Sequence, residues 1–439
     1  MHLDHQTPEI EQALARARTP EQLEEALLQI SRMVPSLMAP EVRGHRLFCS
    51  GLDKAVSELP RRLGLHETPL TKGQDNVVIL ATQLFATGGH SKVATDITQI
   101  LGAEKVTIIC TDIYRKMRYK FLINHINPTA YPLKRRADVI LSAPTLVEKV
   151  VELYCILSAI RPSRIFLMNN HMDAVAVAGA WPFRNVVDYV HHANFMPAIG
   201  SSLKFSAHAD LTYPCHLACR DAGLDPVYAA MMANAESVAP AAIAAADKTR
   251  LRIATCGSQH KYRHPARHRW ADFVVAALSA ADAEIVHIGA YDDDFAAEMV
   301  EALTAAGLNP DRYRFVGRCD NLMVELARQQ ADIYLASYPE GGGRAAVEAV
   351  AAGLPLIIPE ETGHGPLMAD HWPLPQAQAV TTPEELAAAI RDRDRLIAAA
   401  KDPANIARVR DLMGRFTSYV SGVPIPAVDP DVRFAEFGA

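Results

Sequence analysis

The segment from Tyr338 to Pro359, which reads YPEGGGRAAVEAVAAGLPLIIP, constrains the fold more than any other part of the chain. It starts in a loop after an apolar run and passes through three consecutive glycines, Gly341 to Gly343. An alanine-rich stretch typical of a helix follows and reaches Gly353, a residue type that ends helices. The apolar stretch from Leu354 to Ile358 is then predicted to be a buried strand. This order of strand, loop, helix and strand predicts an α/β domain with a parallel sheet.

Two carboxylates flank the middle of this segment. Glu340 lies in the loop before the glycines, and Glu348 lies about one turn inside the predicted helix. Carboxylates accept hydrogen bonds from vicinal hydroxyls, and a helix N-terminus favours an anion. We therefore expect a site for a sugar together with a phosphate. The alternative is that Glu340 is a solvated loop residue and that Glu348 only pairs with Arg344, four residues earlier.

The segment resembles the E-x7-E signature of family 4 glycosyltransferases, which are nucleotide-sugar enzymes of the GT-B fold. Four flanking segments also resemble that family: Phe315 to Gly317, Ala331 to Leu335, Gly353 to Pro355 and Thr382 to Ala387. The resemblance covers most of residues 250–395, and the N-terminal half matches more weakly. It implies an α/β protein with two Rossmann-like domains facing a cleft.

Apolar runs separated by helical patterns extend this reading to the rest of the chain. The first strong strand signal is Asn76 to Leu80, and residues 1–72 read as helices, with Thr19 and Pro20 as one start signal. We predict five parts: a helical N-terminal extension at 1–72, a first Rossmann-like domain on the acceptor side at 73–235, a linker at 236–249, a second Rossmann-like domain that binds the nucleotide sugar at 250–402, and a C-terminal helix and tail at 403–439. By resemblance, the tail returns to the first domain.

Charge and composition exclude several classes of protein. The net charge of −6 and the lack of a concentrated basic face argue against a nucleic-acid partner. We expect no signal peptide and no transmembrane segment, because no stretch approaches the ~20 apolar residues of a membrane span. Seven cysteines without framework spacing favour reduced thiols and a cytoplasmic location. The N-terminal helices are a candidate surface for a homo-oligomer.

The loop after the strand at Leu251 to Thr255 supplies the expected positive charge. Lys261 follows that strand and can neutralise a leaving diphosphate. By resemblance, Glu348 holds the ribose hydroxyls, Glu340 holds the donor-sugar hydroxyls, and the Gly341 to Gly343 amides meet the diphosphate with Lys261. Besides Glu348, the residues expected to bind the donor are Gly257, Ser258, Arg263, Gly317, Gly341, Gly342, Gly343, Arg344, Gly89 and His191. Arg263 is a candidate for the charge that is lost because Ser258 stands where the family usually has arginine.

Two histidines in the first half are further candidates. Val186 to His192 resembles a family strand that ends in a histidine near the donor sugar, and either His191 or His192 is the matching residue. We assign His192 a catalytic role together with Glu340 and Lys261. In the family, an acidic residue often follows the histidine directly, and in this chain none does.

Two segments contain residues that could bind a metal. The D-x-D pattern at Asp292 to Asp294 is better explained as the acidic start of a helix from Phe295 to Leu303. A second cluster contains His208, Asp210, Cys215, His216 and Cys219. Its Cys-x3-Cys spacing lacks the usual hairpin pattern of zinc sites. We therefore expect no metal and no cofactor other than the nucleotide-sugar substrate.

The predicted function is transfer of a hexose from a donor that is UDP-linked rather than GDP-linked, with retention and without a metal, to a glycan, lipid-linked or protein acceptor. Such an enzyme acts in glycan biosynthesis. One alternative is an inverting protein O- or N-glycosyltransferase similar to family 41, which does not require Glu340. The other is a catalytically inactive GT-B assembly subunit.

Overall fold

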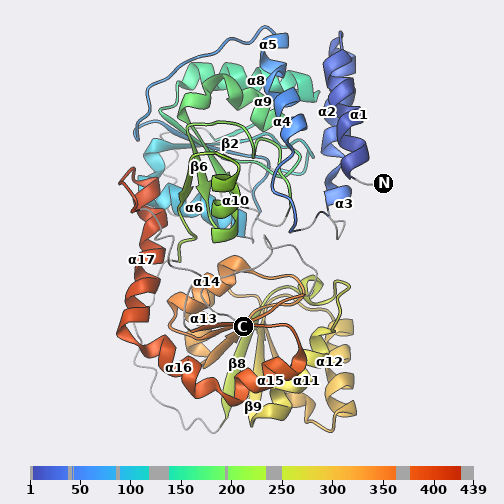
Figure 1. The fold of residues 1–439 in the computed structure, drawn as a ribbon, viewed down its shortest axis with the longest axis vertical. Coiled ribbons are helices and arrows are strands. Elements are labelled where there is room, and N and C mark those ends of the chain that lie inside the picture. Colours follow the sequence, from blue (N-terminus) through green and yellow to red (C-terminus); the bar gives the residue numbers. More distant parts are fainter. Residues whose placement is uncertain are drawn as a thin grey trace. The chain divides into compact units, whose positions relative to one another are not determined.

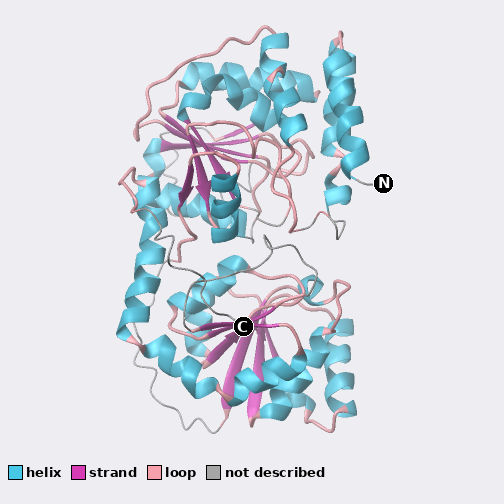
Figure 2. Cartoon of the chain, viewed as in Figure 1, coloured by secondary structure: helices cyan, strands magenta, loops and turns pink. Residues whose placement is uncertain are grey.

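The computed structural model describes residues 3–37, 42, 44–85, 89–117, 138–192, 196–233, 250–361 and 376–426. The chain forms two compact units (Figure 1). The first contains Met1–Ala230 and Arg415–Ala427, and the second contains Met231–His364 and Ala369–Gly414. In each unit, helices pack on the faces of one sheet (Figure 2). Within the described residues, no helix combines the length and the apolar character needed to cross a bilayer.

The first sheet has seven strands in the order β3-β2-β1-β4-β5-β6-β7, all paired in parallel. Its strands are β1 (Val77–Ala81), β2 (Val106–Cys110), β3 (Val139–Ile140), β4 (Arg164–Met168), β5 (Val187–His191), β6 (Ala207–Asp210) and β7 (Pro226–Tyr228). The helices between them are α6 (Gly89–Leu101), α8 (Leu146–Ile160), α9 (Ala174–Ala180) and α10 (Tyr213–Asp221), with short 3-10 turns at Ala103–Lys105 and Trp181–Val186. The first six strands have the order of a Rossmann sheet.

The second sheet repeats this order with six parallel strands, β10-β9-β8-β11-β12-β13. Its strands are β8 (Leu251–Cys256), β9 (Ala283–Ile288), β10 (Tyr313–Gly317), β11 (Ile333–Leu335), β12 (Leu356–Pro359) and β13 (Ala377–Val380). The helices are α11 (Trp270–Ala280), α12 (Asp293–Ala305), α13 (Leu322–Arg328), α14 (Gly343–Ala351), α15 (Pro383–Arg391), α16 (Arg393–Lys401) and α17 (Pro403–Val420), with 3-10 turns at Gln259–Tyr262 and Pro310–Arg312.

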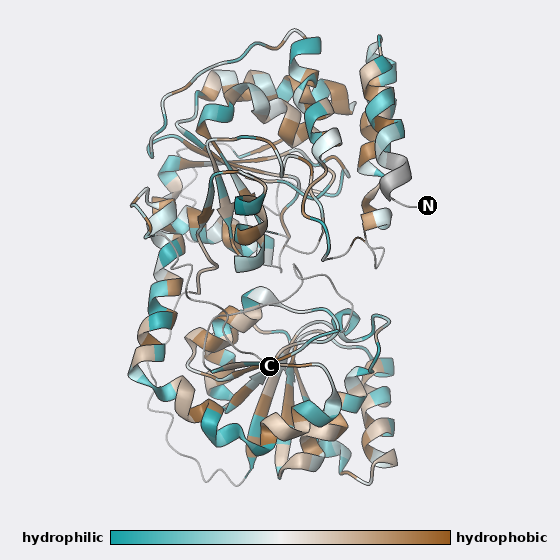
Figure 3. Ribbon diagram, viewed as in Figure 1, coloured by the Kyte–Doolittle hydropathy of each residue, from teal (hydrophilic) through white to brown (hydrophobic). Residues whose placement is uncertain are grey.

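The apolar runs of the sequence become strands that are covered on both faces. Every residue of β1, β2, β4 and β5 is buried, as expected for a parallel sheet between helices. Figure 3 shows the hydrophobic colour concentrated in the strands of both sheets. Helix starts follow ordinary capping rules, because Thr19 and Thr145 each form a capping box and Thr382 caps α15.

The N-terminal helices share the hydrophobic core of the first sheet. They are α1 (Leu3–Arg16), α2 (Pro20–Ser31), α3 (Val34–Leu37), α4 (Ser50–Ser57) and α5 (Leu59–Arg62). Helix α2 packs on α8, and α4 packs on α9. The buried Asp53 carboxylate of α4 accepts hydrogen bonds from the backbone N–H groups of Gly200, at 2.7 Å, and Ser202, at 2.9 Å. The helical region is therefore an integral layer of the first unit, and its apolar face is turned inward.

Two buried arginines, Arg164 and Arg415, join the end of α17 to the sheet of the first unit. Arg164, at the start of β4, donates to the backbone carbonyls of Val420, at 2.8 Å, and Tyr419, at 3.1 Å. The same guanidinium donates to Asp188 at 2.7 Å. Arg415 of α17 donates to the carbonyl of Tyr228 at 3.0 Å. These contacts explain why the last part of the described chain belongs to the first unit.

The elements absent from the sequence prediction include β7, β13 and α16. The edge strands β7 and β13 have only three and four residues, too few to show a periodic pattern. The predicted linker at 236–249 lies outside the described residues.

Candidate functional site

The second sheet places two loops at the point where its strand order reverses. Strands β8 and β11 are neighbours, but the chain leaves β8 toward β9 on one side and leaves β11 toward β12 on the other. Ligands of such sheets bind beyond the carboxyl ends of the strands at this reversal. The loops that follow the two strands, residues 257–264 and 336–343, are called the junction loops below.

The junction loops bring Lys261 and Glu340 together. The Lys261 ammonium donates to the Gly341 carbonyl at 2.8 Å and lies 4.0 Å from the Glu340 carboxylate. The Glu340 backbone N–H donates to the Lys261 carbonyl at 3.3 Å, and Ser337 Oγ donates to the Glu340 carbonyl at 2.7 Å. Both charged side chains keep about a quarter of their surface exposed, with 24% for Lys261 and 22% for Glu340. They are therefore held by backbone bonds while still open to a ligand.

His264 is a residue of this site that the sequence analysis missed. Its Nε2 lies 3.0 Å from the second oxygen of Glu340. The Glu340 carboxylate is thus flanked by an ammonium on one side and an imidazole on the other. The sequence feature that could have identified His264 is its position three residues after Lys261, on the same loop.

Helix α14 starts directly beside Lys261. Gly342 is its N-cap residue and offers no side-chain cap, and a Cβ at this position would lie 3.5 Å from the Lys261 ammonium. The N–H groups of a first helical turn lack intrahelical acceptors and carry the positive end of the helix dipole. The glycines therefore let the backbone approach a ligand where an ammonium and a helix N-terminus combine.

Glu348 forms the ion pair that the sequence offered as an alternative. Its carboxylate accepts from Arg344 Nε at 2.9 Å, and both side chains are largely buried. The carboxylate also lies near the ends of β8 and β10. Burial raises the pKa of Cys256 to about 12 and that of Cys319 to about 11, and the charge of Glu348 adds to both shifts. The pair with Arg344 consequently orients Glu348 within the same edge of the sheet as Lys261.

At the carboxyl edge of the second sheet, the backbone of Gly289 lies directly against the backbones of Gly257 and Gly317. Gly257 donates to the Ile288 carbonyl at 3.0 Å, and Gly289 donates to the Gly317 carbonyl at 2.8 Å. A Cβ on Gly289 would lie only 1.9 Å from the Gly257 oxygen. Ser258 is the N-cap of the next turn, and its backbone carbonyl accepts from the Lys261 N–H at 2.9 Å.

A buried histidine fixes the Gly257 carbonyl. His287 Nε2 donates to that carbonyl at 2.9 Å, so its Nδ1, at 2.7 Å, accepts from the Tyr313 hydroxyl. Trp270 Nε1 donates to the same hydroxyl at 3.1 Å. Burial lowers the pKa of His287 to about 4, which keeps the ring neutral and this tautomer intact near pH 7.

Arg263 and the D-x-D pattern lie against each other, away from Lys261. The Arg263 guanidinium pairs with Asp292 at 3.3 Å and with Glu298 at 3.4 Å. Asp292 is the N-cap of α12 and accepts from the Phe295 N–H at 2.8 Å. The Arg263 side chain is turned toward the acidic start of α12, and its expected charge beside Lys261 stays a prediction.

The first unit gathers the remaining predicted residues at the carboxyl edge of its own sheet. Gly89 begins α6, and the neighbouring His90 ring stacks on His192 with 4.2 Å between ring centroids. His90 Nε2 lies 2.8 Å from the Met168 carbonyl. Burial, followed by the proximity of His90 and His171, holds the pKa of His192 well below its usual range. His192 is therefore a neutral imidazole at neutral pH.

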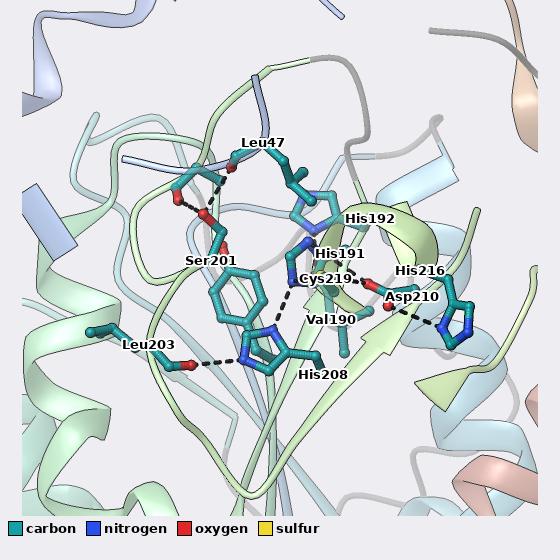
Figure 4. A network of polar contacts seen from close by, with 12 residues as sticks. Leu47, Val190, His191, His192, Ser201, Leu203, His208, Asp210, His216 and Cys219 are labelled. Atoms are coloured by element: carbon teal, nitrogen blue, oxygen red, sulfur yellow. Dashed lines mark hydrogen bonds and ion pairs between the residues drawn. The ribbon is translucent and has the colours of Figure 1, made fainter. Parts of the chain in front are cut away.

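The His191 side chain is buried and lies beside His208 and Cys219, whereas His192 stacks on His90. His191 Nε2 is 2.9 Å from His208 Nδ1 and 3.7 Å from Cys219 Sγ (Figure 4). Only 3% of its surface is exposed. The expected contact of His191 with the donor stays a prediction.

Comparisons with known proteins agree with this architecture. Residues 250–397 match the sequence model of a family described as glycosyl transferases group 1. The sequence matches no curated protein. HepE from Anabaena, solved in complex with UDP-glucose, has 14% identity and a TM-score of 0.52, covering 79% of this chain and 100% of that chain.

Two further solved structures have similar folds. Sucrose-phosphate synthase from Thermosynechococcus elongatus has 16% identity and a TM-score of 0.55, covering 79% of this chain and 98% of that chain. A glycosyltransferase from Rickettsia africae has 13% identity and a TM-score of 0.54, covering 80% and 96%. Residues 250–397 thus form a group 1 glycosyltransferase domain, and the chain that carries it is a glycosyltransferase with the GT-B fold.

Proposed function

We propose that the second unit binds a UDP-linked hexose at the junction loops and that the protein transfers this hexose to an acceptor with retention of configuration. The observation that carries the proposal is the convergence of Lys261, Glu340 and the α14 N-terminus at the strand reversal. The similarity to HepE, whose structure contains UDP-glucose, supports the choice of nucleotide and sugar. The acceptor class is a glycan, a lipid-linked molecule or a protein.

The chemistry follows from where charge develops. As the bond between sugar and diphosphate breaks, negative charge grows on the diphosphate. The Lys261 ammonium and the α14 N–H groups can stabilise that charge without a metal. Glu340, held by His264 and beside Lys261, can accept hydrogen bonds from sugar hydroxyls and stabilise the positive charge that develops on the sugar. The proposed mechanism assigns no metal to the D-x-D pattern, whose Asp292 caps α12.

The first test concerns Glu348, the proposed ribose ligand. Glu348→Ala should weaken UDP and UDP-glucose binding equally, by about 5- to 150-fold, because unpaired buried polar groups cost about 1–3 kcal/mol. Isothermal calorimetry measures both affinities. A matched control is Glu284→Ala, which removes another arginine-paired carboxylate, at the start of β9, and should leave both affinities unchanged. Unchanged UDP affinity in Glu348→Ala would remove Glu348 from the nucleotide site.

The second test is stereochemical. A retaining enzyme needs no base on the acceptor side, whereas an inverting enzyme needs one within hydrogen-bond reach of the acceptor. We expect an α-linked donor to give an α-linked product, and proton NMR of fresh product shows the anomeric coupling. We also expect Glu340→Gln to lose far more turnover than His192→Gln. A β-linked product with an indispensable His192 would support the inverting alternative, and failure to bind any nucleotide sugar would support an inactive assembly subunit.

A further inference from the structure

Three side chains capable of binding a metal converge in the core of the first unit. His191 lies at the end of β5, His208 on β6 and Cys219 on α10 (Figure 4). His191 Nε2, His208 Nδ1 and Cys219 Sγ all lie within 4.8 Å of one another. All three residues are buried, with at most 3% of their surface exposed.

Strand register explains the convergence. Tyr189 pairs with His208 and His191 pairs with Asp210 across the parallel strands β5 and β6. Residues two apart on a strand share a face, so His191, His208 and Asp210 point to the same side of the sheet. Helix α10 follows β6, contacts it and brings Cys219 to this side. The spacing of these residues in the sequence does not reveal this arrangement, because the ligands come from three separate elements.

The outer nitrogen of His208 is hydrogen-bonded as in a metal site, and that of His191 faces a carboxylate. His208 Nε2 lies 2.7 Å from the Leu203 carbonyl and must donate to it, which leaves Nδ1 with its lone pair directed toward the cluster. His191 Nδ1 lies 3.9 Å from the Asp210 carboxylate. Metal-binding histidines usually donate their second N–H to a carbonyl or carboxylate, as His208 does here, whereas His191 and Asp210 are too far apart for a hydrogen bond.

A buried carboxylate, that of Asp210, lies beside the three proposed ligands. Its side chain is fully buried, and within the described residues neither a lysine nor an arginine pairs with it. The side chains that face it are His191, His216 and Cys219. A metal ion at the cluster would therefore lie beside a buried carboxylate as well as its three ligands.

We propose that the first unit holds a zinc ion through His191 Nε2, His208 Nδ1 and Cys219 Sγ, with the Asp210 carboxylate beside them. Imidazole nitrogen and thiolate sulfur are the usual zinc ligands, and three protein ligands leave the fourth position to a water molecule. Binding displaces the Cys219 thiol proton to solvent and involves no redox step. The ion would tie β5, β6 and α10 together, a role separate from sugar transfer.

The test uses the full chain, purified without a histidine tag from zinc-supplemented cells. Elemental analysis should find about one zinc per chain, and Cys219→Ser and His208→Gln should lose it. Cys215→Ser is the matched control, because Cys215 is also buried on α10 but lies outside the cluster, and it should keep the metal. Circular dichroism checks that each variant is folded.

A second measurement does not depend on variants that fold. Wild-type protein freed of metal by a chelator should gain thermal stability when zinc is added. With Co²⁺ it should show the ligand-field bands of a tetrahedral site and a thiolate charge-transfer band that Cys215→Ser retains. Absence of metal in the wild type, together with no response to Zn²⁺ or Co²⁺, would overturn the proposal. So would a charge-transfer band that survives Cys219→Ser.

Discussion

Replacing Lys261 with alanine should lower kcat by about two to three orders of magnitude and raise the donor KM far less. The ammonium lies beside the first turn of α14 and the Gly341 carbonyl, where the diphosphate of the donor would lie. Its interaction with the diphosphate becomes stronger as negative charge grows during bond breaking, so its loss affects the transition state most. Steady-state kinetics with UDP-glucose measures both constants.

Two variants sharpen this experiment. Lys261→Arg keeps the charge and should recover part of kcat, although a planar guanidinium does not reproduce the compact ammonium. Lys401→Ala, which removes a distant exposed lysine of the same unit, should be neutral. If Lys261→Ala changes only KM, the lysine contributes uniform binding and the proposed role in the transition state is wrong.

Replacing Gly289 with alanine should destabilise the second unit by about 3 kcal/mol or more and abolish UDP binding. The new Cβ would lie 1.9 Å from the oxygen and 2.6 Å from the carbonyl carbon of Gly257. These are backbone atoms, and His287 and Ile288 hold Gly257 in place. The loop that carries Lys261 must therefore move. Urea unfolding and calorimetry with UDP measure the two effects.

Gly307→Ala is the control for backbone conformation alone. Gly307 has a φ of +70°, and nothing lies within 4 Å of a Cβ built on it. Its replacement should cost only about 1–2 kcal/mol, the penalty of the left-handed region, and should leave UDP binding intact. Equal stability of the two alanine variants, with normal UDP binding in both, would show that the Gly257 loop adjusts freely.

The sequence predicted the parts of the site that depend on local order along the chain. Lys261 and Glu340 each follow an apolar strand, and the rule for parallel sheets places both at the carboxyl edge. The sequence could not show the direction of the Arg263 side chain. Whether it faces a diphosphate or the acidic residues of α12 depends on how the loop packs on that helix. His264 and His287 were missed for the same reason, since their partners lie far away in sequence.

The first unit was harder to interpret at the level of side chains. Its strands were visible as apolar runs, but which of His191 and His192 faces the core depends on where β5 ends. The meeting of His191 with His208 and Cys219 depends on the register between β5 and β6 and on the packing of α10. The hydrophobic periodicity of a single strand predicts neither this register nor this helix packing.

The bonds from Arg164 to the last turn of α17 have a consequence for how the chain is made. Arg164 is buried and needs the carbonyl groups of Tyr419 and Val420 as acceptors, yet these residues are synthesised about 255 positions later. While the ribosome is still translating the second unit, the guanidinium retains only part of its native bonding. The first unit therefore acquires these two bonds only after Tyr419 and Val420 have been synthesised, and we expect its last packing step to follow translation of the second unit.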